Sequence, residues 1–146
     1  MTHMRAAGRV AALLALAFAV AACATAARAA TACGGDLAGV PRTVASGRYT
    51  VAYITAPDPI VVGRHFVVDF AVCARAGSIT PQAVRVDASM PEHKHGMNYR
   101  PGVTTRGPGM YRAQGLMFHM PGRWELSFDV VSGNTTERLT DTIRLD

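Results

Sequence analysis

The chain has 146 residues, a length typical of one domain together with a short additional segment. Lys and Arg number 15 against 10 Asp and Glu, which gives a net charge of +5, and no block of like charges occurs along the sequence. A positive balance this small and this dispersed argues against a nucleic-acid-binding surface, so we expect no nucleic-acid partner.

Residues 1–30 are organised like a secretory signal peptide. Arg5 and Arg9 precede an uncharged apolar run at residues 10–22, which is shorter than the stretch of about 20 residues that spans a bilayer. An Ala-Arg-Ala sequence at residues 27–29 suits ordinary signal peptidase, whereas Val-Ala-Ala-Cys resembles a lipobox in which Cys23 would be lipidated. Both processing sites stay open, and both predict an exported, periplasmic chain that is either free or lipid-anchored to the membrane.

Cys33 and Cys73 are the two cysteines that follow the leader. An even pair in an exported chain favours a disulfide, which would close a loop of about 40 residues and stabilise the fold by roughly 3–4 kcal/mol. The alternative is that Cys33 is a free thiol or a soft metal ligand.

The rest of the chain predicts one all-β domain. Residues 31–47 are rich in Ala, Gly and Thr and predict an N-terminal tether with little core of its own, followed by a domain at 48–146. Alternating apolar and polar residues and intervening turn residues predict strands at residues 49–54, 65–72, 84–90, 110–119, 122–131 and 135–145. Short strands at this spacing, without helical periodicity, predict an immunoglobulin-like β-sandwich of about seven short strands. Trp124 lies on the apolar face of its strand and is assigned to the core.

Residues 91–109 form the longest irregular stretch and carry the most unusual composition. Every methionine after the leader, and three of the five histidines, lie between residues 90 and 120. In an extended segment His93, His95 and Met97 project to one side, and Gly96 can bend the backbone so that they converge. Imidazole nitrogen and thioether sulfur are ligands that favour copper, so these three residues are a candidate copper site.

Two segments of the chain carry a family resemblance. They are Met90-Pro-Glu-His-Lys-His-Gly-Met97 and, later in the chain, Phe118-His-Met-Pro-Gly-Arg-Trp-Glu-Leu126. Both resemble the YtkA-like domain family, which is related in style to FixH-type domains. The resemblance covers roughly residues 48–145. It implies a small exported β-sandwich, often lipid- or membrane-anchored, and it suggests copper handling near respiratory or periplasmic metalloproteins. The residues carried over are His93, His95 and Met97, with Met90 and His119 as further candidates.

Strand parity leaves the roles of Met90 and His119 open. Met90 continues the apolar face formed by Val84 and Val86, so core packing competes with metal binding. His119 would supply a fourth donor if its face lies beneath the loop, and would be a surface residue if that face meets water.

These patterns predict an exported, non-enzymatic metal-binding protein. Copper, as Cu(I) or Cu(II), would be held by the His/Met loop and passed to, or kept from, another exported metalloprotein or a respiratory protein. Zinc is a lesser alternative because the methionines favour a softer ion. The alternative of a different class is a periplasmic protein-interaction or assembly module without bound metal. No catalytic motif of a hydrolase, zinc protease or phosphate-binding loop is present in the sequence, so we expect no enzyme.

Overall fold

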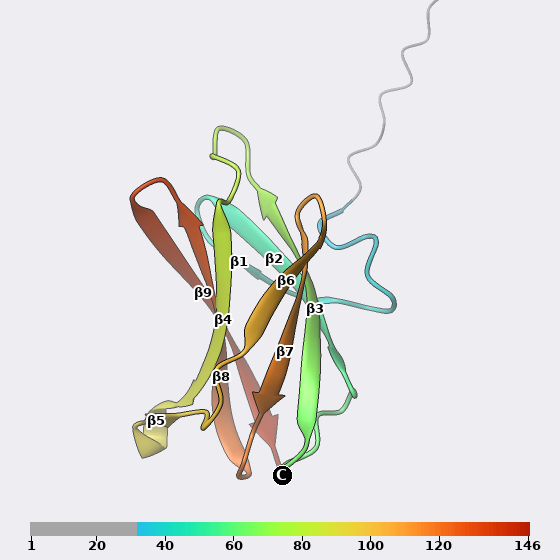
Figure 1. The fold of residues 1–146 in the computed structure, drawn as a ribbon, viewed down its shortest axis with the longest axis vertical. Helices are drawn as coiled ribbons and strands as arrows, with labels where there is room; N and C mark the ends of the chain where they lie inside the picture. Colours follow the sequence, from blue (N-terminus) through green and yellow to red (C-terminus); the bar gives the residue numbers. More distant parts are fainter. Residues whose placement is uncertain (1–31) are drawn as a thin grey trace, which may run out of the picture.

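Two antiparallel β-sheets pack face to face in a computed structural model that describes residues 32–146 (Figure 1). The leader, with Cys23 and both processing sites, lies outside the described residues. One sheet has the strand order β1-β2-β3-β7-β6 and the other β5-β4-β8-β9. The elements are β1 (Arg42–Ala45), β2 (Tyr49–Ala56), β3 (His65–Ala74), β4 (Ala83–Met90), the 3-10 turn η1 (Pro91–His93), β5 (His95–Gly96), β6 (Gly102–Gly107), β7 (Met110–Met117), β8 (Gly122–Ser132) and β9 (Thr135–Leu145). The predicted all-β sandwich is confirmed.

The apolar alternation in β4 and β8 forms half of the core. In β4 every second residue from Val84 to Met90 is buried and the residues between them are exposed. β8 pairs with β4 in antiparallel register, and its inward side chains include Trp124 and Phe128, both fully buried. Because side chains alternate across a strand, this pattern directs one face of the sheet at β2, β3 and β7.

The sandwich contains strands in two segments where the sequence predicted none. Arg42–Ala45, within the predicted tether, pairs with β2 as an edge strand, and the Leu37 side chain before it is buried. Gly102–Gly107, within the predicted irregular stretch, pairs with β7 as the opposite edge of the same sheet. Their small and polar residues leave little apolar alternation, because an edge strand exposes most of its surface.

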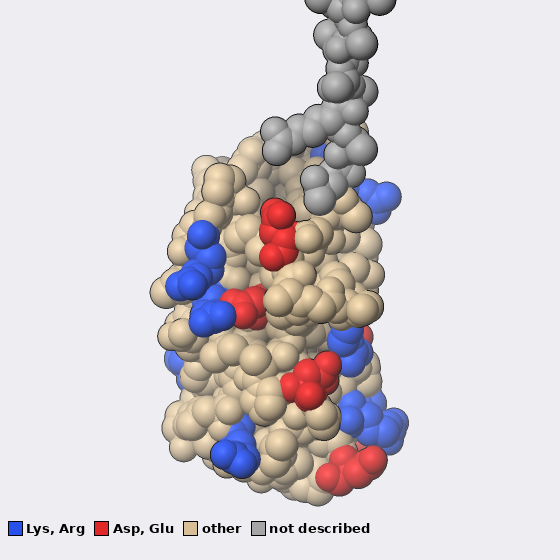
Figure 2. Space-filling model, turned by 90° about the vertical axis from the view of Figure 1, so that its right-hand side faces the viewer, with Lys and Arg blue, Asp and Glu red and all other residues tan. Residues whose placement is uncertain are grey.

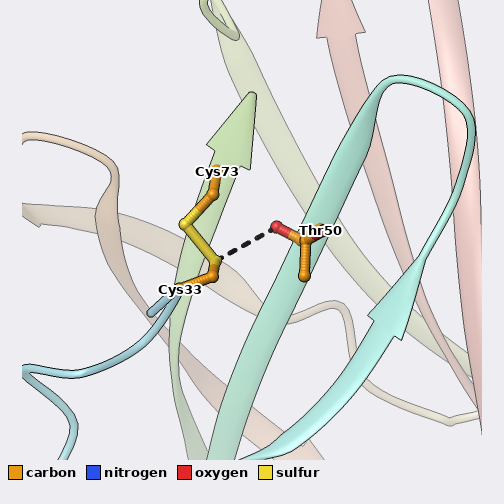
Figure 3. Close-up of a disulfide and its surroundings, with 3 residues drawn as sticks. All are labelled: Cys33, Thr50 and Cys73. Atoms are coloured by element: carbon orange, nitrogen blue, oxygen red, sulfur yellow. Dashed lines mark hydrogen bonds between the residues drawn. A yellow bond between two sulfur atoms is a disulfide. The ribbon is translucent and has the colours of Figure 1, made fainter. Parts of the chain in front are cut away.

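Cys33 and Cys73 form a disulfide, as the cysteine count predicted, so the alternative of a free thiol or metal ligand at Cys33 is wrong. Their Cα atoms lie 5.9 Å apart, and the bond fastens the chain before β1 to the end of β3 (Figure 3). The Cys33 sulfur also lies 3.4 Å from the carbonyl oxygen of Thr50, a close contact in which the disulfide sulfur has no hydrogen to donate.

A polar network joins β1 and β2 of one sheet to β9 of the other. The hydroxyl of Tyr53 in β2 donates to Asp141 Oδ2 in β9 at 2.6 Å, and Arg42 Nε in β1 donates to the same oxygen at 2.9 Å. Burial raises the pKa of the Tyr53 hydroxyl, and the hydrogen bond to Asp141 raises it further. The phenol therefore stays protonated and keeps donating at neutral pH.

Acidic and basic side chains are interspersed over the face seen in Figure 2. Two directly opposed cross-strand pairs are bidentate: Arg112 with Asp69 at 2.6 and 2.7 Å, and Arg138 with Asp129 at 2.7 and 2.8 Å. Such pairs satisfy the charges locally, which fits the weak net charge of the sequence.

Within residues 32–146, none of the helical structure is long and apolar enough to cross a membrane.

Candidate metal centre

The loop that carries the histidines folds back as a tight hairpin at the end of β4. Pro91 opens the η1 turn, and Lys94 has a left-handed backbone conformation with φ of 54°, which reverses the chain. His95 then pairs with Met90 and Gly96 pairs with Ser89, forming the short strand β5. The predicted irregular loop is thus ordered at this point, and the hairpin lies at the lower end of the sandwich in Figure 1.

Three imidazole rings follow one another at this end of the sandwich. The ring centroids of His93 and His95 lie 5.8 Å apart, and those of His95 and His119 lie 5.1 Å apart. His119 is half-buried in the connection between β7 and β8, and its ring lies against the His95 ring of the hairpin. The structure therefore brings together residues that are 24 or more positions apart in the sequence.

The separation of His95 and His119 suits a shared metal ion. A metal bound about 2 Å from one nitrogen of each ring would lie about 3 Å from each ring centroid. Centroids 5.1 Å apart then correspond to a bent nitrogen–metal–nitrogen arrangement. The spacing of the two rings is therefore compatible with both of them binding one ion.

Hydrogen bonding distinguishes the ring nitrogens of these two histidines. Nδ1 of His95 lies 3.1 Å from the Gly96 carbonyl oxygen, so it carries the hydrogen and donates, which leaves Nε2 with a free lone pair. Nδ1 of His119 is buried and has no hydrogen-bond partner among the described residues. A buried imidazole nitrogen without a partner is costly unless a ligand satisfies it. These two nitrogens are the candidate metal donors of the pair.

The methionines lie beside the histidines at different depths. Cross-strand partners share a face, so His95 projects on the same side as its partner Met90, which is fully buried in the core. Met97 lies two residues beyond His95, its backbone N–H donates to the Ala88 carbonyl at 3.1 Å, and its side chain packs against the core. Within residues 32–146, no group of three or more His, Cys, Asp and Glu side chains is arranged around one ion position. The histidine rings that lie close together come as pairs, His93 with His95 and His95 with His119.

An ion-pair bridge fastens the hairpin to β8. Arg123 Nε donates to Glu92 Oε1 at 3.1 Å, and its Nη1 donates to Glu125 Oε1 at 3.1 Å. The hydrogen bond to Glu92 raises the pKa of the guanidinium, which is already charged at neutral pH. The bridge links η1, which ends at His93, to the strand that carries Trp124.

Trp124 belongs to this site although strand parity assigned it only to the core. Its indole ring centroid lies 5.3 Å from that of His119 and 6.0 Å from that of His95. The sequence held a signal for the first contact, since Pro121-Gly122 forms a tight connection between His119 and Trp124. The second contact depends on the hairpin, which the sequence did not predict.

A family model described as YtkA-like matches residues 43–129, a span that includes β2, β3, β4, the hairpin and His119. The chain belongs to the YtkA-like family. A solved structure of a DUF4426 family protein from Pseudomonas aeruginosa is similar to this YtkA-like chain, with 13% identity, a TM-score of 0.45, and coverage of 73% of this chain and 96% of that chain. No curated protein sequence matches.

Proposed function

We propose that this YtkA-like protein is an exported, non-enzymatic copper-binding protein whose main donors are His95 and His119. The observation that carries the proposal is their pairing, with ring centroids 5.1 Å apart and a buried, unpartnered Nδ1 on His119. His93 and Met97 lie next to this pair and supply further nitrogen and sulfur. Met90, buried behind His95, contributes the apolar support of the site.

The donor types favour copper, and Cu(I) in particular. Imidazole and thioether are borderline and soft ligands, whereas hard cations take carboxylate and carbonyl oxygen. Met90 is the cross-strand partner of His95, and the Met97 side chain packs against the core two residues further along the chain. A low-coordinate Cu(I) ion needs few ligands, and two imidazoles with one sulfur satisfy it.

Export is supported by the disulfide between Cys33 and Cys73, because such bonds persist in oxidising compartments. The leader predicts the same compartment, with Cys23 as the residue that would carry a lipid. In that compartment the protein would pass copper to, or keep it from, another exported metalloprotein or a respiratory protein.

Copper titrations in the presence of a competing chelator test the proposal. Purified protein is titrated with Cu(I) under anaerobic conditions, and separately with Cu(II). The His95→Ala/His119→Ala variant should lower the Cu(I) affinity at least about 100-fold, since even outer partners of metal ligands contribute 10- to 100-fold.

His65→Ala is the matched control because His65 is an exposed histidine on β3, where its ring packs edge-on against Tyr99. This variant should keep the wild-type affinity. Equal affinities for wild type and the double variant would overturn the proposal and favour an interaction module without metal.

A further inference from the structure

We propose that the indole of Trp124 is a direct part of the copper site and gives it a preference for the monovalent ion. This inference rests on the proposed function. The rings of His95, His119 and Trp124 form a triangle with centroid separations of 5.1, 5.3 and 6.0 Å. An ion shared by the two imidazoles would therefore be bound next to the indole.

The indole is held rigidly in this position. Trp124 is fully buried, its Nε1–H donates to the Met120 carbonyl at 3.0 Å, and Phe118 stacks on it with centroids 4.5 Å apart and an interplanar angle of 12°. The two imidazoles stand nearly perpendicular to the indole, at 70° and 82°. The hydrogen bond to Met120 and the stack with Phe118 fix the indole before any ion binds.

A cation close to an indole ring is attracted by the electrons of the ring, and Trp gives the strongest such interaction. The attraction is largest when water is excluded, and the rings around this site are buried or half-buried. The desolvation penalty of a buried ion rises with the square of its charge, so an apolar aromatic surface favours a monovalent ion over a divalent one. Trp124 thus adds selectivity that the histidines alone would not provide, since imidazole also accepts Zn(II) and Cu(II).

The chain contains a single tryptophan, so its absorption and emission report on this one position. Wild-type protein is titrated with Cu(I), with Ag(I) as a monovalent ion that resists redox change, and with Zn(II). One equivalent of Cu(I) or Ag(I) should shift the indole absorption and lower the emission, and Zn(II) should do so only at much higher concentration. The His95→Ala/His119→Ala variant should lose the spectral response.

Two variants separate contact with the ion from packing in the core. Trp124→Phe should lower the Cu(I) affinity about 3- to 30-fold, the range expected for a desolvated cation–π contact, and should lower the Zn(II) affinity less. Phe128→Leu is the matched control, because Phe128 is fully buried on the same strand but packs against Tyr53 and Phe70. It should leave both affinities unchanged.

The outcomes are distinguishable. If wild type binds Cu(I) but its indole absorption does not shift, Trp124 is only a core residue and the inference is wrong; this measurement decides even if Trp124→Phe does not fold. Equal Cu(I) affinities for Trp124→Phe and Phe128→Leu would overturn the inference in the same way. If wild type binds Cu(I) no better than the double histidine variant, the proposed function and the inference fail together.

Discussion

Removal of the disulfide should destabilise the fold strongly without affecting the site. Cys33 and Cys73 are 40 residues apart, and closing a loop of that length lowers the entropy of the unfolded chain enough to stabilise the folded state by about 4 kcal/mol. The Cys33→Ala/Cys73→Ala variant also frees the segment around Leu37, which is buried against the sandwich. We therefore expect a loss of about 3–5 kcal/mol in the free energy of unfolding.

Urea denaturation followed by circular dichroism measures this loss. With a slope of about 1–3 kcal/mol per molar urea for a small domain, the midpoint should fall by more than about 1 M. Wild type treated with a reductant should unfold at nearly the same midpoint as the variant. A loss below about 1 kcal/mol in both samples would show that the loop-closure reasoning does not hold for this chain.

Three further predictions concern the fold. Tyr53→Phe should lose about 1 kcal/mol at pH 7 by urea denaturation. Because the folded-state pKa of Tyr53 is raised, its contribution to wild-type stability should be constant below about pH 10 and fall above it. The same alkaline decline in the Tyr53→Phe variant would contradict this reasoning. Asp129→Asn should lose up to about 1 kcal/mol at pH 7, because the hydrogen bonds from Arg138 lower the pKa of Asp129. This contribution to stability is complete above about pH 4 and disappears as the pH falls through the folded-state pKa of Asp129. A stability difference between wild type and variant that persists at lower pH would argue against the ion pair as its source. Gly122→Ala should lose about 1–3 kcal/mol in thermal or urea unfolding, since φ of +120° is strained for any residue with a Cβ and the Met90 side chain must also shift to admit the added atom. Wild-type stability for this variant would contradict the backbone argument.

The sequence predicted the central strands because their two faces differ. β4 alternates strictly between core and solvent, β8 does so apart from the buried Ser127, and the burial of Val84, Met90 and Trp124 follows from that parity. The edge strands β1 and β6 were missed because their residues are mostly exposed and show no alternation. β5 has two residues, too few for any period to be seen.

Part of the candidate site could be predicted and part could not. His93 and His95 were identified from their local spacing, and Cys33 with Cys73 from their number. The approach of His119 to His95 depends on pairing between β4 and β5 and on the corner after β7, both of which are tertiary features. The contact of Trp124 with both histidines follows only once these elements are in place.

The disulfide and the histidine hairpin lie at opposite ends of the sandwich (Figure 1). The longest strands, with 11 residues each, give the domain a reach of about 35 Å between these ends. A protein held at its N-terminal side would therefore present His95 and His119 outward, well clear of the point of attachment. Under the proposed function, the sandwich would be a rigid spacer between the point of attachment and the histidines.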